Sequence, residues 1–225
     1  MVRRAAAKTL GELGACDGVD VEMLFTVFKR LAEDQYDNVR LVAVESCATI
    51  VKNLPANLKE SFVQTLEGIG EDKSWRVRLS LCKVLEATCL TMGEDVTRTH
   101  LVRLFVTLLR DHEAEVRGEA CKAIEVMCRV AGADSFVEEI VPVIEQLAVD
   151  AEHDTELTVR SPLVTAVTRL PRLLGQEMAA RSILPILKTC IMGDANGGAG
   201  NGVAIGLSAS DLQLMILHEL TVLDG

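Results

Sequence analysis

The dipeptide Val-Arg recurs along this chain at a nearly constant spacing. The copies that follow this spacing are Val2-Arg3, Val39-Arg40, Val77-Arg78, Val116-Arg117 and Val159-Arg160. The intervals between them are 37, 38, 39 and 43 residues. A period of about 40 residues is typical of α-solenoids, in which antiparallel helix pairs stack on one another. The repeat therefore predicts an all-α solenoid, and it directs the functional question toward proteins that bind the stack.

Apolar residues follow each Val-Arg at a helical spacing. Counted from the Val as position 0, positions +4, +8 and +11 are mostly apolar, as in Ala43, Cys47 and Ile50 of the second copy. These positions share one face of an α-helix, which we name the B helix. A second amphipathic segment, the A helix, precedes each B helix. The predicted A helices are 21–33, 58–70, 100–110, 137–149 and 179–190.

Proline distinguishes between the known kinds of helical repeat. Pro142 and Pro185 fall inside predicted A helices, where proline removes a hydrogen bond and kinks the helix. A kinked A helix is a feature of HEAT repeats and argues against a tetratricopeptide stack. We therefore predict a HEAT-repeat solenoid that forms a right-handed superhelix of about five repeats.

The repeats divide the whole chain into one array without separate domains. We predict a half repeat at 1–16 and repeats at about 20–54, 57–92, 98–132, 136–175 and 178–225, the last with a glycine-rich insertion at 193–206. The fourth turn is four residues longer than the others, an insertion that we place at 151–157. In the B helix after it, Pro162 fits a first helical turn, whereas Pro171 should kink or shorten the helix.

A fixed acidic residue marks the turn between the A and B helices. An Asp lies six residues before the Arg in the pairs Asp34 and Arg40, Asp72 and Arg78, Asp111 and Arg117, and Asp154 and Arg160. A carboxylate there can accept backbone N–H groups at the start of the B helix. It can also pair with an Arg of its own or of the neighbouring repeat. We predict a ladder of Asp–Arg bonds along the stack, with these arginines in a structural role.

Composition excludes several kinds of partner and location. The net charge is −10, which disfavours nucleic acid as a partner. No apolar run reaches the roughly 18 residues that span a bilayer, so we expect no membrane partner. The seven cysteines include no CxxC pair, and several recur at the same repeat position. They are typical of small buried residues in a reducing compartment, which predicts the cytoplasm, with the nucleus as a second location.

Four stretches of the chain carry a resemblance to a known family. The runs 1–8, 39–47, 71–78 and 114–117 resemble the scaffold (A, structural) subunit of protein phosphatase 2A. The segment is similar to that family's array from the second helix of repeat four to about repeat eight. This resemblance implies a scaffold without enzymatic activity or cofactor, bound to a regulatory B subunit. It implies contact with the catalytic subunit only through repeats that this chain lacks.

The family's contacts come from the turns between A and B helices, which implies a set of contact residues here. Trp75 beside Arg76 is the leading candidate, because a turn tryptophan next to an arginine suits an interface anchor. The full set of partner-binding candidates is Arg3, Arg4, Asp37, Lys73, Ser74, Trp75, Arg76, Glu113 and Glu115. The bare ends of the array also predict end-to-end self-association.

Two other functions remain open at this point. Another HEAT-repeat adaptor, such as a nuclear transport receptor or a chromosome-complex component, would share the repeats but not the Asp72–Arg78 turn. A HEAT-like di-iron hydroxylase would need four His-Glu pairs. Only His112-Glu113 and His218-Glu219 occur, and the four histidines have no metal-ligand spacing, so we predict no metal site.

Overall fold

The chain folds into two layers of helices. The computed structural model describes residues 2–16, 18–150 and 158–192, and these ranges contain helices and turns but no β-strand. The A layer consists of α2 (Val21–Ala32), α5 (Lys59–Gly70), α7 and α8 (Glu94–Val96, Val102–Leu109), α11 and α12 (Ala133–Ser135, Val141–Asp150), and α15 and α16 (Gln176–Met178, Leu184–Met192). The B layer consists of α1 (Val2–Gly14), α3 and α4 (Asp37–Glu45, Cys47–Ile50), α6 (Trp75–Met92), α9 and α10 (Ala114–Cys121, Ile124–Ala131), and α13 and α14 (Arg160–Val167, Pro171–Leu174).

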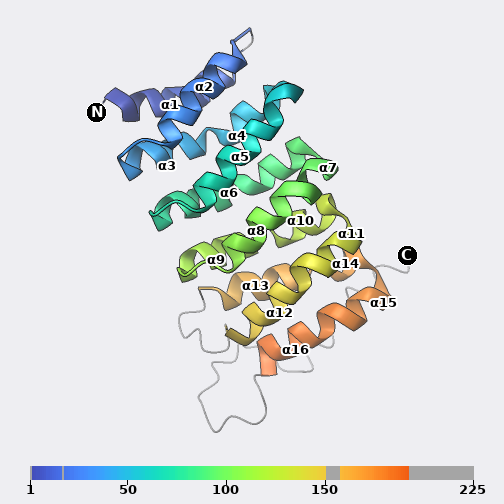
Figure 1. Cartoon of the computed structure of the whole chain (residues 1–225). Coiled ribbons are helices and arrows are strands. Elements are labelled where there is room, and N and C mark those ends of the chain that lie inside the picture. The colour runs from blue at the N-terminus through green and yellow to red at the C-terminus, as the bar shows by residue number, and fades with distance from the viewer. Residues whose placement is uncertain (1, 17, 151–157, 193–225) are drawn as a thin grey trace.

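Each helix contacts its counterpart in the next repeat. In the B layer α1 contacts α3, α3 contacts α6, α6 contacts α9 and α9 contacts α13. The A helices α2, α5, α8, α12 and α16 follow one another in the same way (Figure 1). Contacts thus connect near neighbours along one axis, as a solenoid requires. The predicted all-α HEAT-repeat solenoid is confirmed.

The periodic apolar stripe forms the contact between the two layers. Val77, Leu81, Leu85 and Thr88, at positions 0, +4, +8 and +11 of α6, are all 0% exposed. The same positions in the B helices of the neighbouring repeats are also buried. Burial of these side chains, at about 25 cal/mol per Å² of apolar surface, is the main source of cohesion between the layers.

Only one of the four stripe positions of α1 is buried. Leu10 at position +8 is 2% exposed, but Val2 at position 0 is 83% exposed and Leu13 at position +11 is 44% exposed. Met23 and Val27 of α2 extend this exposed apolar edge. The surface agrees with the expectation of end-to-end self-association, which stays a prediction.

Three A helices begin earlier than we predicted. The structure starts them at Glu94, Ala133 and Gln176 rather than at 100, 137 and 179. Each start directly follows a glycine with positive φ: Gly93 at 85°, Gly132 at 87° and Gly175 at 77°. Glycine adopts this conformation without a steric penalty, so the chain reverses in one residue and the next helix starts at once. The motif Gly-x-Asp/Glu at 93–95, 132–134 and 175–177 is the signal that could have located these starts.

The helix irregularity expected at proline has a different origin. A five-residue π-helical turn, at 97–101, 136–140 and 179–183, precedes α8, α12 and α16. Pro142 and Pro185 each follow such a turn, but Arg103 holds the equivalent place after the first one. Proline therefore accompanies the irregularity without being required for it.

The prolines of the B helix after the fourth turn behave as predicted. Pro162 lies in the first turn of α13, and α13 ends at Val167 before Pro171 starts α14. The insertion at 151–157 with Asp154, the glycine-rich 193–206 segment and the last predicted B helix lie outside the described residues.

Candidate protein-interaction ridge

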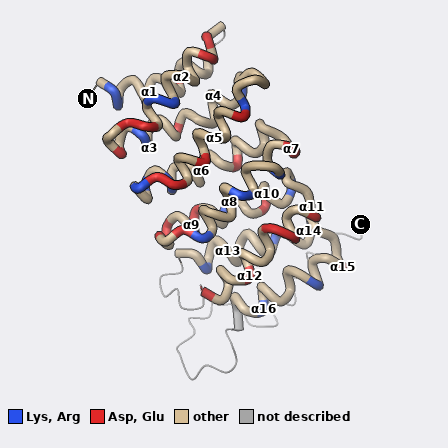
Figure 2. The backbone as a smooth tube through the Cα atoms, in the orientation of Figure 1, with Lys and Arg blue, Asp and Glu red and all other residues tan. Residues whose placement is uncertain are grey.

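Three turns between A and B helices line up at one end of the helices. We name these turns, residues 33–38, 71–76 and 110–115, the turn ridge. They join α2 to α3, α5 to α6, and α8 to α9. Acidic and basic segments gather where α3, α6 and α9 begin (Figure 2). The ridge contains seven of the nine partner-binding candidates, and Arg3 and Arg4 lie beside it on α1.

The constant position of the turn aspartates has a capping role. Asp72 Oδ1 accepts a hydrogen bond from the backbone N–H of Ser74 at 2.8 Å. Asp111 Oδ1 accepts one from Glu113 at 2.9 Å, and Asp34 Oδ1 accepts one from Tyr36 at 3.0 Å. The donor is in each case the residue that caps the B helix, so these bonds fix where the helix begins.

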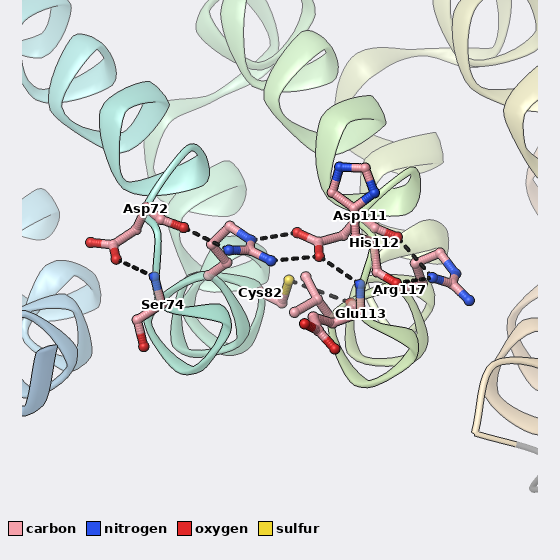
Figure 3. Close-up of polar contacts among 9 residues, drawn as sticks. Asp72, Ser74, Cys82, Asp111, His112, Glu113 and Arg117 are labelled. Atoms are coloured by element: carbon pink, nitrogen blue, oxygen red, sulfur yellow. Dashed lines mark hydrogen bonds and ion pairs between the residues drawn. The ribbon is translucent and has the colours of Figure 1, made fainter.

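The same carboxylates receive arginines from the preceding repeat. Arg40 donates Nε–H to Asp72 Oδ2 at 2.6 Å and Nη2–H to Oδ1 at 2.8 Å. Arg78 makes the same two bonds to Asp111, at 2.6 and 2.8 Å (Figure 3). The four side chains are between 6% and 13% exposed. Paired donors on a planar guanidinium match a carboxylate in direction as well as charge, so each pair fixes the rotation of one repeat on the next.

The third nitrogen of each arginine anchors its own turn. Nη1–H of Arg40 donates to the carbonyl of Asp34 at 2.8 Å, and Nη1–H of Arg78 donates to that of Asp72 at 2.6 Å. Arg117 repeats this bond with Asp111 at 2.8 Å. The sequence left open whether an arginine would pair within its repeat or with its neighbour. The structure shows both: the backbone carbonyl belongs to the same repeat and the carboxylate to the next.

The ladder extends further toward the N-terminus than predicted. Arg3, which we expected to contact a partner, pairs with Asp34 at 2.6 Å and stacks its guanidinium on Tyr36 at 5.4 Å from the ring centroid. Its side chain is 52% exposed, so this pair is weaker than the buried ones. Arg4 is exposed, and its contact with a partner stays a prediction.

The C-terminal part of the predicted ladder has a different form. Arg117 would meet Asp154, which lies outside the described residues. Arg160 donates Nε–H to the carbonyl of Cys190 at 2.8 Å. At this position the arginine therefore holds an A helix, α16, by its backbone.

The ion pairs shift the titration of their members. Burial alone would raise the pKa of Asp111, but the hydrogen bonds from Arg78 and from the Glu113 N–H outweigh it and hold the pKa below its usual value. The hydrogen bond to Asp111 likewise raises the pKa of Arg78. Both groups are therefore charged throughout the neutral range.

The exposed side of the ridge presents groups that the ladder does not use. The Arg76 guanidinium lies 5.1 Å from the centroid of the partly buried Trp75 ring. Lys73, Glu113 and Glu115 are exposed. Asp37 is exposed too, and its Oδ2 accepts a hydrogen bond from the Ser74 hydroxyl at 3.3 Å. A stacked aromatic–arginine pair surrounded by charges of both signs suits a protein partner.

Tyr36 is a ridge residue that the sequence analysis missed. It is 56% exposed and forms the second aromatic–arginine stack, with Arg3. The chain has one tyrosine and one tryptophan, and both lie in turns of the ridge. This shared placement was the sequence signal that could have identified Tyr36 as a ridge residue.

The described residues were predicted to hold no metal site, and their thiols are mostly buried. No group of three or more His, Cys, Asp or Glu among them is placed to hold a metal ion, and His218-Glu219 lies outside these residues. Burial raises the pKa of the Cys82 and Cys89 thiols to about 12, which leaves them unreactive at neutral pH. Cys16 is exposed. Within the described ranges no helix has the length and apolarity needed to cross a membrane.

Comparisons with known proteins agree with the fold and the resemblance. Residues 94–175 match the PPP2R1A-like HEAT repeat family. The beta isoform of the human 65 kDa A-type regulatory subunit of serine/threonine-protein phosphatase 2A is 35% identical over 99 residues, which cover 42% of this chain and 16% of that protein's length. The crystal structure of an engineered protein, a Northeast Structural Genomics Consortium target, superposes with a TM-score of 0.56 at 16% identity, over 98% of this chain and 90% of its own. The chain thus contains a HEAT-repeat segment like that of the phosphatase 2A scaffold.

Proposed function

We propose that this chain is a non-enzymatic scaffold segment of a protein phosphatase 2A holoenzyme that binds a regulatory B subunit through the turn ridge. The observation that carries the proposal is that the residues joining the repeats differ from the residues that the ridge exposes. The buried Asp and Arg side chains hold the repeats together, whereas Arg76 and its charged neighbours are exposed beside the partly buried Trp75 ring. The similarity of residues 94–175 to phosphatase 2A scaffold repeats supports the choice of partner.

The mechanism is geometric. The ladder fixes each turn relative to the next, so the anchors of the ridge keep a constant spacing. A rigid row of anchors orients a large partner at low entropic cost, because few side chains must become ordered on binding. In this proposal the catalytic subunit binds to repeats other than those of this chain.

The proposed partner and the buried thiols support a proposal about location. We propose that the protein works in the cytoplasm, and in the nucleus as a second compartment. Six of the seven cysteines are buried free thiols, a state that a reducing compartment maintains. Fractionation of cells that express the tagged chain would test this location.

A binding assay tests the proposed function. The chain is immobilised, and purified regulatory and catalytic phosphatase subunits are passed over it separately. We expect a regulatory subunit to bind and the catalytic subunit not to bind. The double variant Trp75→Ala/Arg76→Ala should weaken binding at least tenfold, because aromatic and arginine anchors dominate protein interfaces. Arg76→Glu, at an exposed position, should weaken it without affecting the fold.

The matched control lies at the other end of the same repeat. Leu90→Ala/Arg98→Ala also removes one apolar and one cationic side chain, both exposed, at the end of α6 and the start of the next A helix. This variant should bind like the unmodified chain. Binding to neither subunit, or equal loss in both double variants, would contradict the ridge as the site and favour another HEAT-repeat adaptor.

A further inference from the structure

Exposed apolar side chains are concentrated on one edge of the molecule. Seven large apolar or aromatic side chains are exposed in the described ranges, and four of them lie on α1 and α2: Val2, Leu13, Met23 and Val27. These two helices form one end of the stack, which we name the α1–α2 edge (Figure 1). The position of Val2 is buried in all four later copies of the motif, as in Val39. The edge therefore exposes positions that later repeats cover.

The same two helices carry opposite charges at their two ends. Arg4 of α1 and Arg30 of α2 are exposed at the end nearest the turn ridge. Glu12 of α1 and Glu22 of α2 are exposed at the other end. None of these four side chains forms an ion pair within the described part of the chain. They are therefore available to charges on another molecule.

The charges of the two helices lie at matching levels. Residues 15–20 connect α1 to the antiparallel α2, so the end of α1 lies beside the start of α2. Glu12 and Glu22 are two residues and one residue from this shared end, and Arg4 and Arg30 are ten and nine residues from it. An α-helix rises about 1.5 Å per residue, so the members of each pair differ in level by about 1.5 Å.

Neighbouring charges do not cancel this arrangement. At the end nearest the ridge, Arg3 is already paired with Asp34. Lys29 and Glu33 line the gap between α2 and α5, so they face the next repeat instead of the edge. Asp20, the N-cap residue of α2, adds a carboxylate at the acidic end. The α1–α2 edge is therefore positive at one end and negative at the other.

An edge with this charge distribution is complementary to itself in one orientation. A two-fold axis that crosses both helices reverses their direction, so Arg4 faces Glu12 of the second copy and Arg30 faces its Glu22. An axis parallel to the helices would instead place arginine opposite arginine and glutamate opposite glutamate, which is unfavourable. A head-to-tail contact lacks an apolar match, because none of the exposed large apolar side chains in the described ranges lies on α13 to α16.

We propose that the α1–α2 edge binds the same edge of a second copy of this chain, in antiparallel orientation about a two-fold axis. The axis passes near Lys8 and Thr26, which are the midpoints of the two Arg–Glu pairs. A two-fold contact of this kind closes at two copies. The contact does not involve the turn ridge, so it holds whether or not the ridge binds a phosphatase subunit.

The apolar side chains of the edge then meet between the charged ends. Val2 approaches Leu13 of the second copy, and Met23 approaches its Val27. Their burial supplies the favourable free energy, and the charges select the orientation. Because the helices of the two copies are reversed, the two turn ridges lie on opposite sides of the dimer. Each copy therefore keeps its ridge accessible to a partner.

Sedimentation velocity of the full chain over a wide concentration range tests the association. We expect the mass to rise from the 24.4 kDa of one chain to twice that value and no further. A contact made by two helices on each side is small, so the dimer should dissociate on dilution. A single chain at every concentration, or a series of larger oligomers from head-to-tail contact, would overturn the proposal.

Charge reversal tests the orientation. Arg30→Glu should weaken the dimer about tenfold, because the symmetry converts two attractive contacts into two repulsive ones. Glu22→Arg should have the same effect, and the double variant Arg30→Glu/Glu22→Arg should restore affinity to within about threefold. The control Arg103→Glu reverses an exposed arginine on α8 and should change nothing. A double variant as weak as the single ones would contradict the antiparallel contact.

Apolar variants connect the association to the edge. Met23→Ser/Val27→Ser removes two exposed apolar side chains from α2 and should abolish the dimer. The matched control, Leu90→Ser/Val149→Ser, removes two exposed apolar side chains elsewhere and should leave it unchanged. All four positions are exposed, so circular dichroism should show the same helical content in both variants. Equal loss of the dimer in the two double variants would overturn the α1–α2 edge as the contact.

Discussion

The junctions on the two sides of α9 use the same motif in different ways. Between α6 and α9, Arg78 of one repeat holds Asp111 of the next by two short bonds. Between α9 and α13, Gly118 lies so near the Thr158 carbonyl that a Cβ on it would overlap the oxygen. The Val-Arg motif thus positions each B helix, and the side chains around it decide whether a junction is clamped by charge or closed by backbone proximity.

The largest expected effect comes from breaking the clamped junction. Arg78→Met would leave Asp111, only 6% exposed, without its cation and should cost about 3 kcal/mol of unfolding free energy. Urea unfolding followed by Trp75 fluorescence measures the loss. The control Arg98→Met removes an exposed arginine that pairs with Glu94 and Asp95, and should cost less than about 0.5 kcal/mol. Similar losses for the two variants would show that the clamp adds no stability.

The backbone contact should be next in sensitivity. Gly118→Ala places a methyl group against the Thr158 carbonyl and should cost about 2 kcal/mol through overpacking. Gly68→Ala is the matched control, because its Cβ would meet nothing within 4 Å on α5. That substitution should stabilise the protein by about 0.5–1 kcal/mol through helix propensity. Thermal unfolding of both variants measures these changes. An unchanged melting temperature for Gly118→Ala would mean that the α9–α13 junction accommodates the extra methyl group without loss of stability.

A double-mutant cycle asks whether the clamp continues past α9. If Asp154 pairs with Arg117, then Arg117→Met and Asp154→Asn should be non-additive by about 1 kcal/mol. The cycle of Arg78→Met with Asp111→Asn provides the reference and should show a larger coupling energy. Strictly additive effects of the Arg117 and Asp154 substitutions would indicate that the ladder ends at Asp111. The α9–α13 junction would then lack the ion pair that joins α6 to α9.

The smallest effect concerns pH. Because the pKa of Asp111 is lowered in the folded state, the carboxylate contributes stability above the unfolded value of about 4, and this contribution is lost as pH falls through the folded value. The stability difference between the unmodified chain and Asp111→Asn should therefore shrink below about pH 4. Urea midpoints at several pH values measure this, and a constant difference would argue against a lowered pKa.

Repetition made the main features of this fold predictable. Five copies of Val-Arg located the B helices and their buried stripe, and the constant Asp-to-Arg spacing indicated a ladder. The pairing partner could not be read in the same way, because the six-residue spacing within one turn is equally compatible with bonds inside and between repeats. Only the stacking distance between helices selects the neighbour's carboxylate.

Features that depend on a single residue's backbone or size were harder to predict. The early A-helix starts rest on positive φ at Gly93, Gly132 and Gly175, and composition gives no φ angle. Gly118 stands where α3 and α6 carry leucine, and the Thr158 carbonyl that excludes a larger side chain there approaches only once the helices are side by side. Tyr36 gained its role from a stacking partner on another helix, Arg3.

Because every clamp joins one repeat to the next, the clamps are in series along the axis of the stack. A force applied to the two ends would load all of them equally, and the weakest junction would part first. Each released repeat of about 39 residues would lengthen the chain by about 13 nm at full extension. The molecule would then stretch in discrete steps, so that its length under tension would record how many junctions had opened.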